Sequence, residues 1–190
     1  MARHAFYTTF EISQICGVNP TTVQNWVKGK KLRAFQTPGG HRRVRREDLV
    51  AFLKEFGMPI PADLSQDPPM ILIVDDETDI LDMLEDLLKS GEDEVRVAKA
   101  RNGVDALLMI GETKPDLLIL DIMLPGMNGF DVCKKLKSSP GTRSIKIVAI
   151  SGDHNPAVKE RIMAAGADLF FTKPLEIIGF REQCFNLLQK

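Results

Sequence analysis

A set of polar residues in this chain follows short apolar runs, and their types suit phosphoryl chemistry. The set is Asp75 and Asp76 after residues 70–74, Asp121 after residues 117–120, Ser151 after residues 147–150, and Lys173, which follows residues 169–171 and Thr172. Carboxylates are ligands for a hard divalent cation such as Mg²⁺. An ammonium group and a hydroxyl stabilise charge on phosphoryl oxygens. Together these residues predict a site for a metal ion and a phosphoryl group.

The apolar runs predict the elements that position this set. Short continuous apolar runs that alternate with helical stretches are typical of a parallel sheet covered by helices on both faces. We expect strands near residues 70–75, 94–99, 116–121, 146–151 and 168–173, each followed by a helix. In such sheets ligands bind beyond the carboxyl ends of the strands, where the strand order reverses. The expected fold class is α/β, with a doubly wound five-stranded parallel sheet.

The helical stretches carry apolar residues three and four positions apart, which predicts one buried face on each helix. The spacing is clearest in two sets: Ile80, Leu84, Leu87 and Leu88, and Ile177, Phe180, Cys184 and Leu187. We expect both sets to pack in the core.

From Pro69 to Lys190 the sequence resembles the receiver domain of bacterial two-component response regulators. The motifs that carry the resemblance are Asp75-Asp76, Asp121 with Pro125 and Gly129 behind it, Ala149-Ile150-Ser151, and Lys173-Pro174. The resemblance implies a flavodoxin-like receiver domain over residues 70–190. It also implies a histidine kinase as the phosphodonor and Mg²⁺ as the cofactor.

The resemblance assigns roles at the metal and the nucleophile. Asp121 would take a phosphoryl group from a phosphohistidine, since carboxylate attack to form an acyl phosphate is established covalent chemistry. Asp76 and Asp121 would ligate Mg²⁺ directly, and Asp75 would act largely through water. The third protein ligand would be the backbone carbonyl of Met123.

Three further residues would act on the phosphoryl group or respond to it. Lys173, with the metal, would neutralise the phosphoryl charge, and Ser151 would donate a hydrogen bond to a phosphoryl oxygen. Ser151 and Phe170, the aromatic residue three before Lys173, would form the switch. Because Phe170 lacks a hydroxyl, an inward rotation of its ring needs only apolar burial. A ring that stays in place is the alternative interpretation.

The two parts of the chain carry opposite charge. Residues 1–60 hold ten Lys and Arg against four Asp and Glu, and residues 61–190 hold fifteen against twenty-two. Opposite signs suggest a polyanionic partner for the first part and a cationic one for the second.

The basic part predicts two helices joined by a short turn. Thr8 and Glu11 have capping-box spacing, and Asn19-Pro20 is typical of a helix start. The buried residues should be Ile12, Ile15 and Cys16 in the first helix and Val23, Trp26 and Val27 in the second. This is helix-turn-helix spacing, in which the second helix enters the major groove of DNA. The residues of that helix that lie away from the buried stripe are Thr21, Thr22, Gln24, Asn25 and Lys28.

A basic hairpin and a third helix follow. Pro38-Gly39-Gly40 predicts a tight turn, four arginines lie on the return strand, and Leu49, Phe52, Leu53 and Phe56 predict the buried face of the helix. Residues 5–57 resemble the winged helix-turn-helix domains of the MerR and excisionase families. The match is carried by the segments 18–26 and 37–43. The resemblance implies that the wing tip holds DNA phosphates, with His41, Arg42 and Arg43 as the candidates.

The expected domains are a MerR/excisionase-like DNA-binding domain over residues 1–57, a linker over residues 58–69 and the receiver over residues 70–190. The linker assignment rests on Pro59, Pro61, Pro68 and Pro69. Prolines favour extended chain, so about twelve residues at about 3.1 Å each would separate the domains by roughly 35 Å.

Composition excludes several classes of protein. Three widely spaced cysteines without CxxC spacing argue against a disulfide framework or a zinc site, and for a reducing cytosol. No apolar run approaches the roughly 20 residues that a membrane span needs. We therefore expect a cytoplasmic protein without a membrane partner.

These observations predict a DNA-binding response regulator, not an enzyme, that a histidine kinase phosphorylates on Asp121. One alternative is an architectural, excisionase-like DNA-binding protein. Another is a phosphorelay adaptor whose first domain binds protein. A homodimer could form through the receiver or by side-by-side binding on DNA repeats, and both arrangements stay open.

Overall fold

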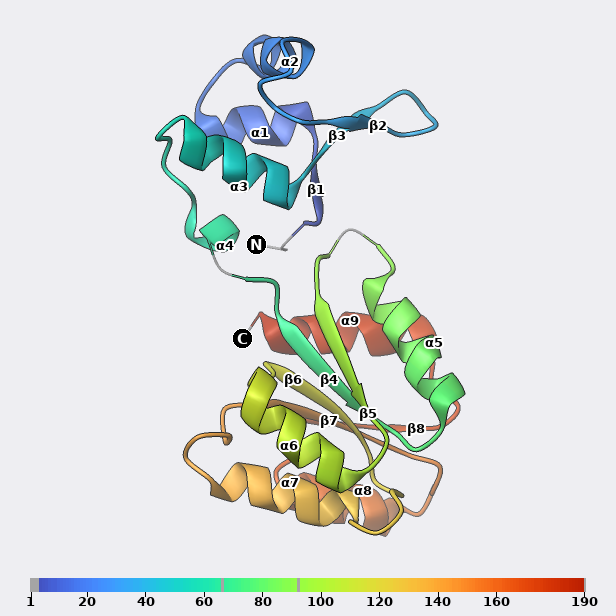
Figure 1. Ribbon diagram of the computed structural model, residues 1–190. Helices are drawn as coiled ribbons and strands as arrows, with labels where there is room; N and C mark the ends of the chain where they lie inside the picture. Colours follow the sequence, from blue (N-terminus) through green and yellow to red (C-terminus); the bar gives the residue numbers. More distant parts are fainter. Residues whose placement is uncertain (1–3, 66, 92, 190) are drawn as a thin grey trace. The chain divides into compact units, whose positions relative to one another are not determined.

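The computed structural model of the chain describes residues 4–65, 67–91 and 93–189, which form two compact units (Figure 1). One unit holds the residues up to Pro68 together with Gly91–Glu94, and the other holds Pro69–Ser90 and the residues from Val95 onward. Within the described residues no helix has the length and apolar character needed to cross a membrane.

The second unit is built on the predicted parallel sheet. Its strands are β4 (Met70–Val74), β5 (Arg96–Ala100), β6 (Leu117–Asp121), β7 (Lys146–Ser151) and β8 (Leu169–Thr172). They lie in the order β5-β4-β6-β7-β8, and every neighbouring pair is parallel. The doubly wound α/β fold expected from the sequence is confirmed.

Helices cover both faces of this sheet (Figure 1). They are α5 (Thr78–Lys89), α6 (Gly103–Thr113), α7 (Gly129–Ser138), α8 (Pro156–Ala164) and α9 (Ile177–Leu188). α5 and α9 pack on one face, and α6, α7 and α8 pack on the other. Leu118 and Leu120 of β6 point to the second face, and Leu117 and Ile119 point to the first. Because both faces are covered, the strands are continuous apolar runs.

The predicted helical stripes reach the core except at one residue. Ile80, Leu87 and Leu187 are partly buried and pack against it. Leu84, Leu88, Phe180 and Cys184 are fully buried. Ile177, which was expected in the core, is 48% exposed. Ile177 is the first residue of α9, about one turn before the fully buried Phe180, so it lies at the exposed end of the stripe.

The first unit is a small helical domain with a three-stranded antiparallel sheet. Its elements are β1 (Phe6–Tyr7), α1 (Thr9–Cys16), α2 (Pro20–Lys28), β2 (Phe35–Gln36), β3 (Arg42–Arg45), α3 (Arg46–Glu55) and α4 (Ala62–Ser65). The strand order is β1-β3-β2, so β3 is paired on both sides.

Local capping places α1 and α2 as the sequence predicts. The Glu11 backbone N–H donates to Thr8 Oγ1 at 3.1 Å, and the Thr8 backbone N–H donates to Glu11 Oε2 at 2.7 Å. Gly17 ends α1 in the left-handed region at φ 64°. Asn19 is the N-cap of α2, but its side chain makes no capping hydrogen bond, and Pro20 is the first helical residue.

The core of this unit joins the three helices. Ile12, Val23 and Leu49 are fully buried, and the Trp26 ring lies 4.9 Å from the Phe52 ring. Phe56, which was expected on the buried face of α3, is 47% exposed. It follows the last residue of α3 and packs on Phe52 from outside, with ring centroids 4.7 Å apart.

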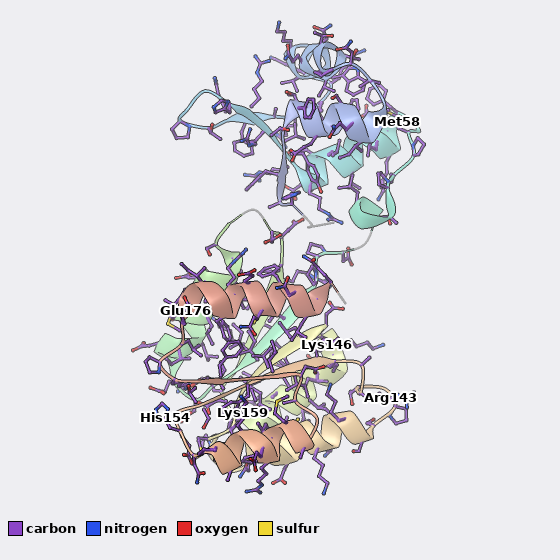
Figure 2. The ribbon with its side chains drawn as sticks, turned by 180° about the vertical axis from the view of Figure 1, so that it is seen from behind. Met58, Arg143, Lys146, His154, Lys159 and Glu176 are labelled. Carbon is purple, nitrogen blue, oxygen red and sulfur yellow. The ribbon has the colours of Figure 1, made fainter. Side chains whose placement is uncertain are left out.

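The segment after α3 differs from the extended linker expected over residues 58–69, of which residue 66 lies outside the described residues. It contains α4, and Leu64 is only 1% exposed. Met58, labelled in Figure 2, and Ile60 pack against the same core. Arg46 Nη2 donates to the Leu64 carbonyl at 2.9 Å. Apolar residues between the prolines therefore bind this segment to the first unit.

Removing the Leu64 side chain should destabilise the first unit. Leu64→Ala leaves a cavity in the core and should lower the free energy of unfolding by about 2–5 kcal/mol. Fluorescence of Trp26, the single tryptophan of the chain, during urea unfolding would measure this. Glu55→Ala, at an exposed position of α3, is the matched control. An unchanged midpoint for Leu64→Ala would show that the segment is a free linker.

Candidate functional sites

The carboxyl edge of the parallel sheet gathers the polar set. Asp75 directly follows β4, Asp121 ends β6, Ser151 ends β7 and Lys173 directly follows β8. Strand order reverses between β4 and β6, which is where ligands of doubly wound sheets bind. In Figure 2 this edge is the end marked by His154 and Glu176, opposite the end marked by Arg143 and Lys146.

The Lys173 ammonium group joins the two buried carboxylates of the site. Its Nζ donates to Asp75 Oδ2 at 2.8 Å and to Asp121 Oδ2 at 2.6 Å. Asp75 is 1% exposed and Asp121 is 5% exposed. The other carboxylate oxygens accept from backbone N–H groups, Asp75 Oδ1 from Glu77 at 3.0 Å and Asp121 Oδ1 from Met123 at 2.8 Å. Both carboxylates are thus held in fixed orientations.

Burial and this ion pair set the charge states. Burial raises the pKa of the Asp75 carboxyl above its ordinary value, although the hydrogen bond from Lys173 acts in the opposite direction. Burial alone would lower the pKa of Lys173, but hydrogen bonds to Asp121 and Asp75 outweigh it and raise that pKa. Lys173 therefore remains a cation, fixed beside the Asp121 carboxylate.

The three carboxylates could hold a divalent cation. One oxygen each from Asp75, Asp76 and Asp121 lies within 4.8 Å of the other two. The adjoining surface is a depression of about 520 Å³ lined by Asp76, Glu77, Asp121, Met123, Gly152, Asp153 and Lys173. Mg²⁺ takes oxygen ligands and keeps several waters, so this donor set and open space fit it.

Ser151 and Phe170 lie on adjacent strands. Ser151 is fully buried, and its Oγ accepts from the Asp153 backbone N–H at 3.0 Å. Ser151 pairs with Thr172, and Phe170 is two residues before Thr172, so Ser151 and Phe170 point to the same face of the sheet. Phe170 is half-buried and packs against the core under α6, α7 and α8.

Glu77 and the packing role of Gly129 were not anticipated from the sequence. Glu77 supplies the N–H that orients Asp75, and its Oε1 lies 3.6 Å from Lys173 Nζ. Glu77 directly follows Asp75 and Asp76, and this run of three acids could have identified it as a candidate from the sequence. Gly129 donates its N–H to the Ile122 carbonyl at 3.1 Å, and a Cβ there would lie 2.7 Å from the Asp121 carbonyl oxygen. Its missing side chain lets α7 begin directly against the end of β6.

The second candidate site is on α2. Thr21, Gln24, Asn25 and Lys28 are exposed, and their spacing of three, four and seven residues places them on one face of the helix. Thr22 is half-buried and lies beside that row. The structure thus brings together four of the five predicted residues of this helix as a single polar face.

The hairpin separates the predicted phosphate contacts. His41 and Arg42 are exposed, and Arg43 is half-buried. Arg42 pairs with Gln36 and Arg43 pairs with Phe35, so the two arginines point to opposite faces of the sheet. A single partner surface could therefore contact only one of the two arginines directly. Near the tip of the hairpin, His41 and Arg42 are the exposed candidates.

Comparison with known families gives a match for each unit. The family described as "Response regulator receiver domain" matches residues 71–183. The family described as "Helix-turn-helix domain" matches residues 6–56. The two matches agree with the two units of the structure.

Curated relatives share the second unit. Response regulator PleD of Caulobacter vibrioides is 39% identical over 106 residues, which are 56% of this chain and 23% of PleD. Polar-differentiation response regulator DivK of Brucella anthropi is 33% identical over 116 residues, 60% of this chain and 92% of DivK. DNA-binding response regulator MtrA of Mycobacterium leprae is 36% identical over 107 residues, 56% of this chain and 45% of MtrA. The chain thus spans less than a quarter of PleD and less than half of MtrA.

Solved structures show the same fold. The signal receiver domain of a DNA binding response regulator protein (merR) from Colwellia psychrerythraea has a TM-score of 0.60 and 32% identity, covering 65% of this chain and all of that one. A putative response regulator from Chloroflexus aurantiacus has a TM-score of 0.61 and 31% identity, with the same coverage.

Adding a methyl group at Gly129 should disturb the edge of the sheet. In Gly129→Ala, the new Cβ meets backbone atoms of Asp121 and Ile122 at 2.7 Å, so α7 must move. Overpacking of this kind should cost about 1–3 kcal/mol of stability. Differential scanning calorimetry would measure the loss.

Gly141→Ala is the matched control, because a Cβ at Gly141 meets no atom within 4 Å. Equal thermal stability of the two variants would show that the Gly129 contact has no role in holding α7.

Proposed function

The chain belongs to the family of response regulator receiver domains, and on that premise we propose that it is a DNA-binding response regulator controlled by phosphorylation of Asp121. The Lys173 ammonium group held against the buried Asp75 and Asp121 carboxylates carries the proposal. The ammonium group places a fixed positive charge beside the Asp121 carboxylate, at the edge of the sheet where a phosphoryl group would bind. The helix-turn-helix match over residues 6–56 supports DNA binding as the activity that phosphorylation controls.

In the proposed reaction, a carboxylate oxygen of Asp121 attacks the phosphorus of a phosphohistidine on a histidine kinase. The new O–P bond forms as the N–P bond breaks. The phosphorylated ring nitrogen keeps the electron pair, and the proton on the other ring nitrogen of the phosphohistidine lets the ring leave as neutral imidazole. Lys173 is already in place to donate a hydrogen bond to a phosphoryl oxygen and to offset its negative charge. The protein does no other chemistry in this proposal, so it is not a conventional enzyme.

Mg²⁺ would be held by Asp76, Asp121 and the backbone carbonyl of Met123, with Asp75 acting through water. When bound, the ion supplies charge neutralisation on the phosphoryl oxygens. Asp75 and Lys173 would keep the Asp121 carboxylate oriented while the group is transferred. Their short hydrogen bonds in the structure support that division of labour.

The response to phosphorylation would pass through Ser151 and Phe170. A hydrogen bond from the Ser151 hydroxyl to a phosphoryl oxygen would draw the end of β7 toward Asp121. Phe170 points to the same face on the adjacent strand, and its half-buried ring can follow without a hydroxyl to satisfy. The movement would change the receiver surface around α8 and α9, its fourth and fifth helices, where a receiver-to-receiver homodimer would form.

The output would be double-stranded DNA, bound by a winged helix-turn-helix domain of the MerR/excisionase type over residues 1–57. The exposed face of α2 would read base edges, with Gln24 and Asn25 suited to adenine and Lys28 to guanine. Arg42 and His41 at the hairpin tip, and Arg43 beside it, would hold phosphates. The relative named a DNA-binding response regulator, MtrA, supports a transcriptional role. DNA and a kinase as partners would place the protein in the cytoplasm.

Replacing the nucleophile should abolish phosphoryl uptake. Asp121→Asn removes the attacking carboxylate oxygen, so incubation with acetyl phosphate and Mg²⁺ should give no phosphorylated species by intact-protein mass spectrometry. Asp131→Asn, an exposed acid in the first turn of α7, should be phosphorylated like the parent chain. Equal labelling of Asp121→Asn and the parent would remove Asp121 from the reaction.

Changes on the hairpin and on α2 should affect DNA binding differently. Arg42→Ala should weaken binding to all sequences and reduce the salt slope by about 1, because one phosphate contact is lost. Gln24→Ala should instead relax preference at one base pair by about 1–3 kcal/mol. Fluorescence anisotropy against a set of duplexes and salt concentrations separates the two effects.

Lys54→Ala is the control, since Lys54 is an exposed cation in the last turn of α3 and belongs to neither element. A loss for Lys54→Ala as large as for Arg42→Ala would mean that general positive charge, not the hairpin, binds DNA.

A further inference from the structure

The outer face of the small sheet carries four side chains from three strands. Phe6 of β1 pairs with Arg45 of β3, and Phe35 of β2 pairs with Arg43 of β3. Paired residues point to the same face of a sheet, and so do residues two apart on one strand. Phe6, Phe35, Arg43 and Arg45 therefore share one face. The residues that alternate with them, Tyr7 and Val44, are buried against the helices.

Two phenylalanine rings meet on this face. The centroids of Phe6 and Phe35 are 5.2 Å apart and their planes cross at 75°, an edge-to-face contact. Phe6 is 37% exposed and Phe35 is 39% exposed. Both rings are therefore partly open to solvent. Paired exposed rings on a polar domain are typical of a contact surface.

The charged groups around the rings carry both signs. Arg45 Nη1 lies 3.5 Å from Glu47 Oε1, and the two side chains are 61% and 72% exposed. A depression of about 260 Å³ beside them is lined by Arg33, Ala34, Phe35, Arg45, Glu47 and Asp48. Phosphate-binding surfaces are basic, because each carboxylate repels the DNA backbone. Arg43, on the same face, is nearer the hairpin tip and is left to DNA, whereas the mixed charge around Arg45 and Glu47 favours a protein partner.

We propose that this outer face, formed by Phe6, Phe35, Arg45 and Glu47, binds the same face of a second copy of the chain when two copies occupy adjacent DNA sites. This inference rests on the DNA binding proposed above. A face that bears its own countercharges is self-complementary about a twofold axis, so Arg45 of one copy can meet Glu47 of the other. The ring pairs would then form the apolar centre of an isologous contact.

The size of the face explains why DNA is needed. Two half-exposed rings and one ion pair per copy make a patch well below the roughly 800 Å² per partner of a stable interface. Two copies held side by side on DNA gain a high effective concentration, and a weak contact then becomes significant. In the described part of the first unit, the helices after the hairpin are 10 and 4 residues long, too short for a dimerising coiled coil.

The first experiment compares duplexes with one and two binding sites. The full chain would select a sequence from a random DNA pool, and duplexes with one copy of it or two adjacent copies in inverted orientation would be titrated, because a twofold contact needs inverted sites. For Phe6→Ser/Phe35→Ser, affinity for the single site should be unchanged. The cooperative gain on the double site should fall about tenfold, equivalent to about 1.4 kcal/mol.

A charge exchange tests the contact without removing any apolar core. Arg45→Glu leaves two acids at positions 45 and 47, and Glu47→Arg leaves two bases. Each variant alone should lose the cooperative gain, because like charges face each other across the axis. An equimolar mixture should restore it on the double site, since opposite charges then meet. A purely intrachain Arg45–Glu47 pair stays broken in both chains, so mixing would restore nothing.

Each outcome decides one claim. Full cooperativity in both the phenylalanine and the charge variants would overturn the inference while leaving DNA binding intact. Loss of single-site affinity in Arg45→Glu matched by gain in Glu47→Arg would assign the face to DNA and also overturn it. Absence of selection from the DNA pool would contradict the proposed function itself. If the phenylalanine variant unfolds by Trp26 fluorescence, the charge exchange alone decides.

Discussion

The second unit depends on one constraint: two buried carboxylates must share a single cation. Asp75 and Asp121 are nearly inaccessible to water, and burying such charges is costly unless they are paired. Lys173 pairs with both, and it comes from the far side of the sheet, after β8. The sheet order, with β6 next to β4 and β7 before β8, is what lets one ammonium group reach both acids. The site is thus a property of the whole sheet and not of one loop.

The same constraint makes the site sensitive to a phosphoryl group. Several donors near Asp121 already have partners: Lys173 Nζ and the Met123 N–H donate to Asp121, and, one strand away, the Asp153 N–H donates to Ser151 Oγ. A new anion at Asp121 must take some of these donors. Ser151 ends β7, and Lys173 directly follows β8, the strand that contains Phe170. A change in the hydrogen bonds of these two residues would therefore move the ends of both strands and not only their side chains. That is the physical basis on which a small modification could alter the surface of the receiver.

Much of this arrangement could be predicted because apolar runs of five residues leave few choices of fold. Strand positions were right within two residues, and the convergence of Asp75, Asp121 and Lys173 followed from parallel topology alone. The predictions of burial failed where burial depends on which other elements pack against the residue. Ile177 and Phe56 continue an apolar spacing past the surface that the helix covers, so they are exposed. Leu64 lies between prolines, and the prolines predicted an extended backbone. They gave no indication that the Leu64 side chain is part of the core of the first unit. The ring contact between Phe6 and Phe35 depends on how three short strands are aligned. A local sequence pattern does not show that alignment, so the contact could not be predicted.

In the proposed function, phosphorylation of Asp121 changes how the chain binds DNA. The most direct measurement is binding of the full chain to a library of genomic fragments, with and without Mg²⁺ and beryllofluoride, an anion that mimics the phosphoryl group. We expect selected fragments to bind with an affinity that shifts when the mimic is added, and we expect Asp121→Asn to abolish the shift. Selective binding that is indifferent to the mimic, or no selective binding in either state, would contradict the proposed function.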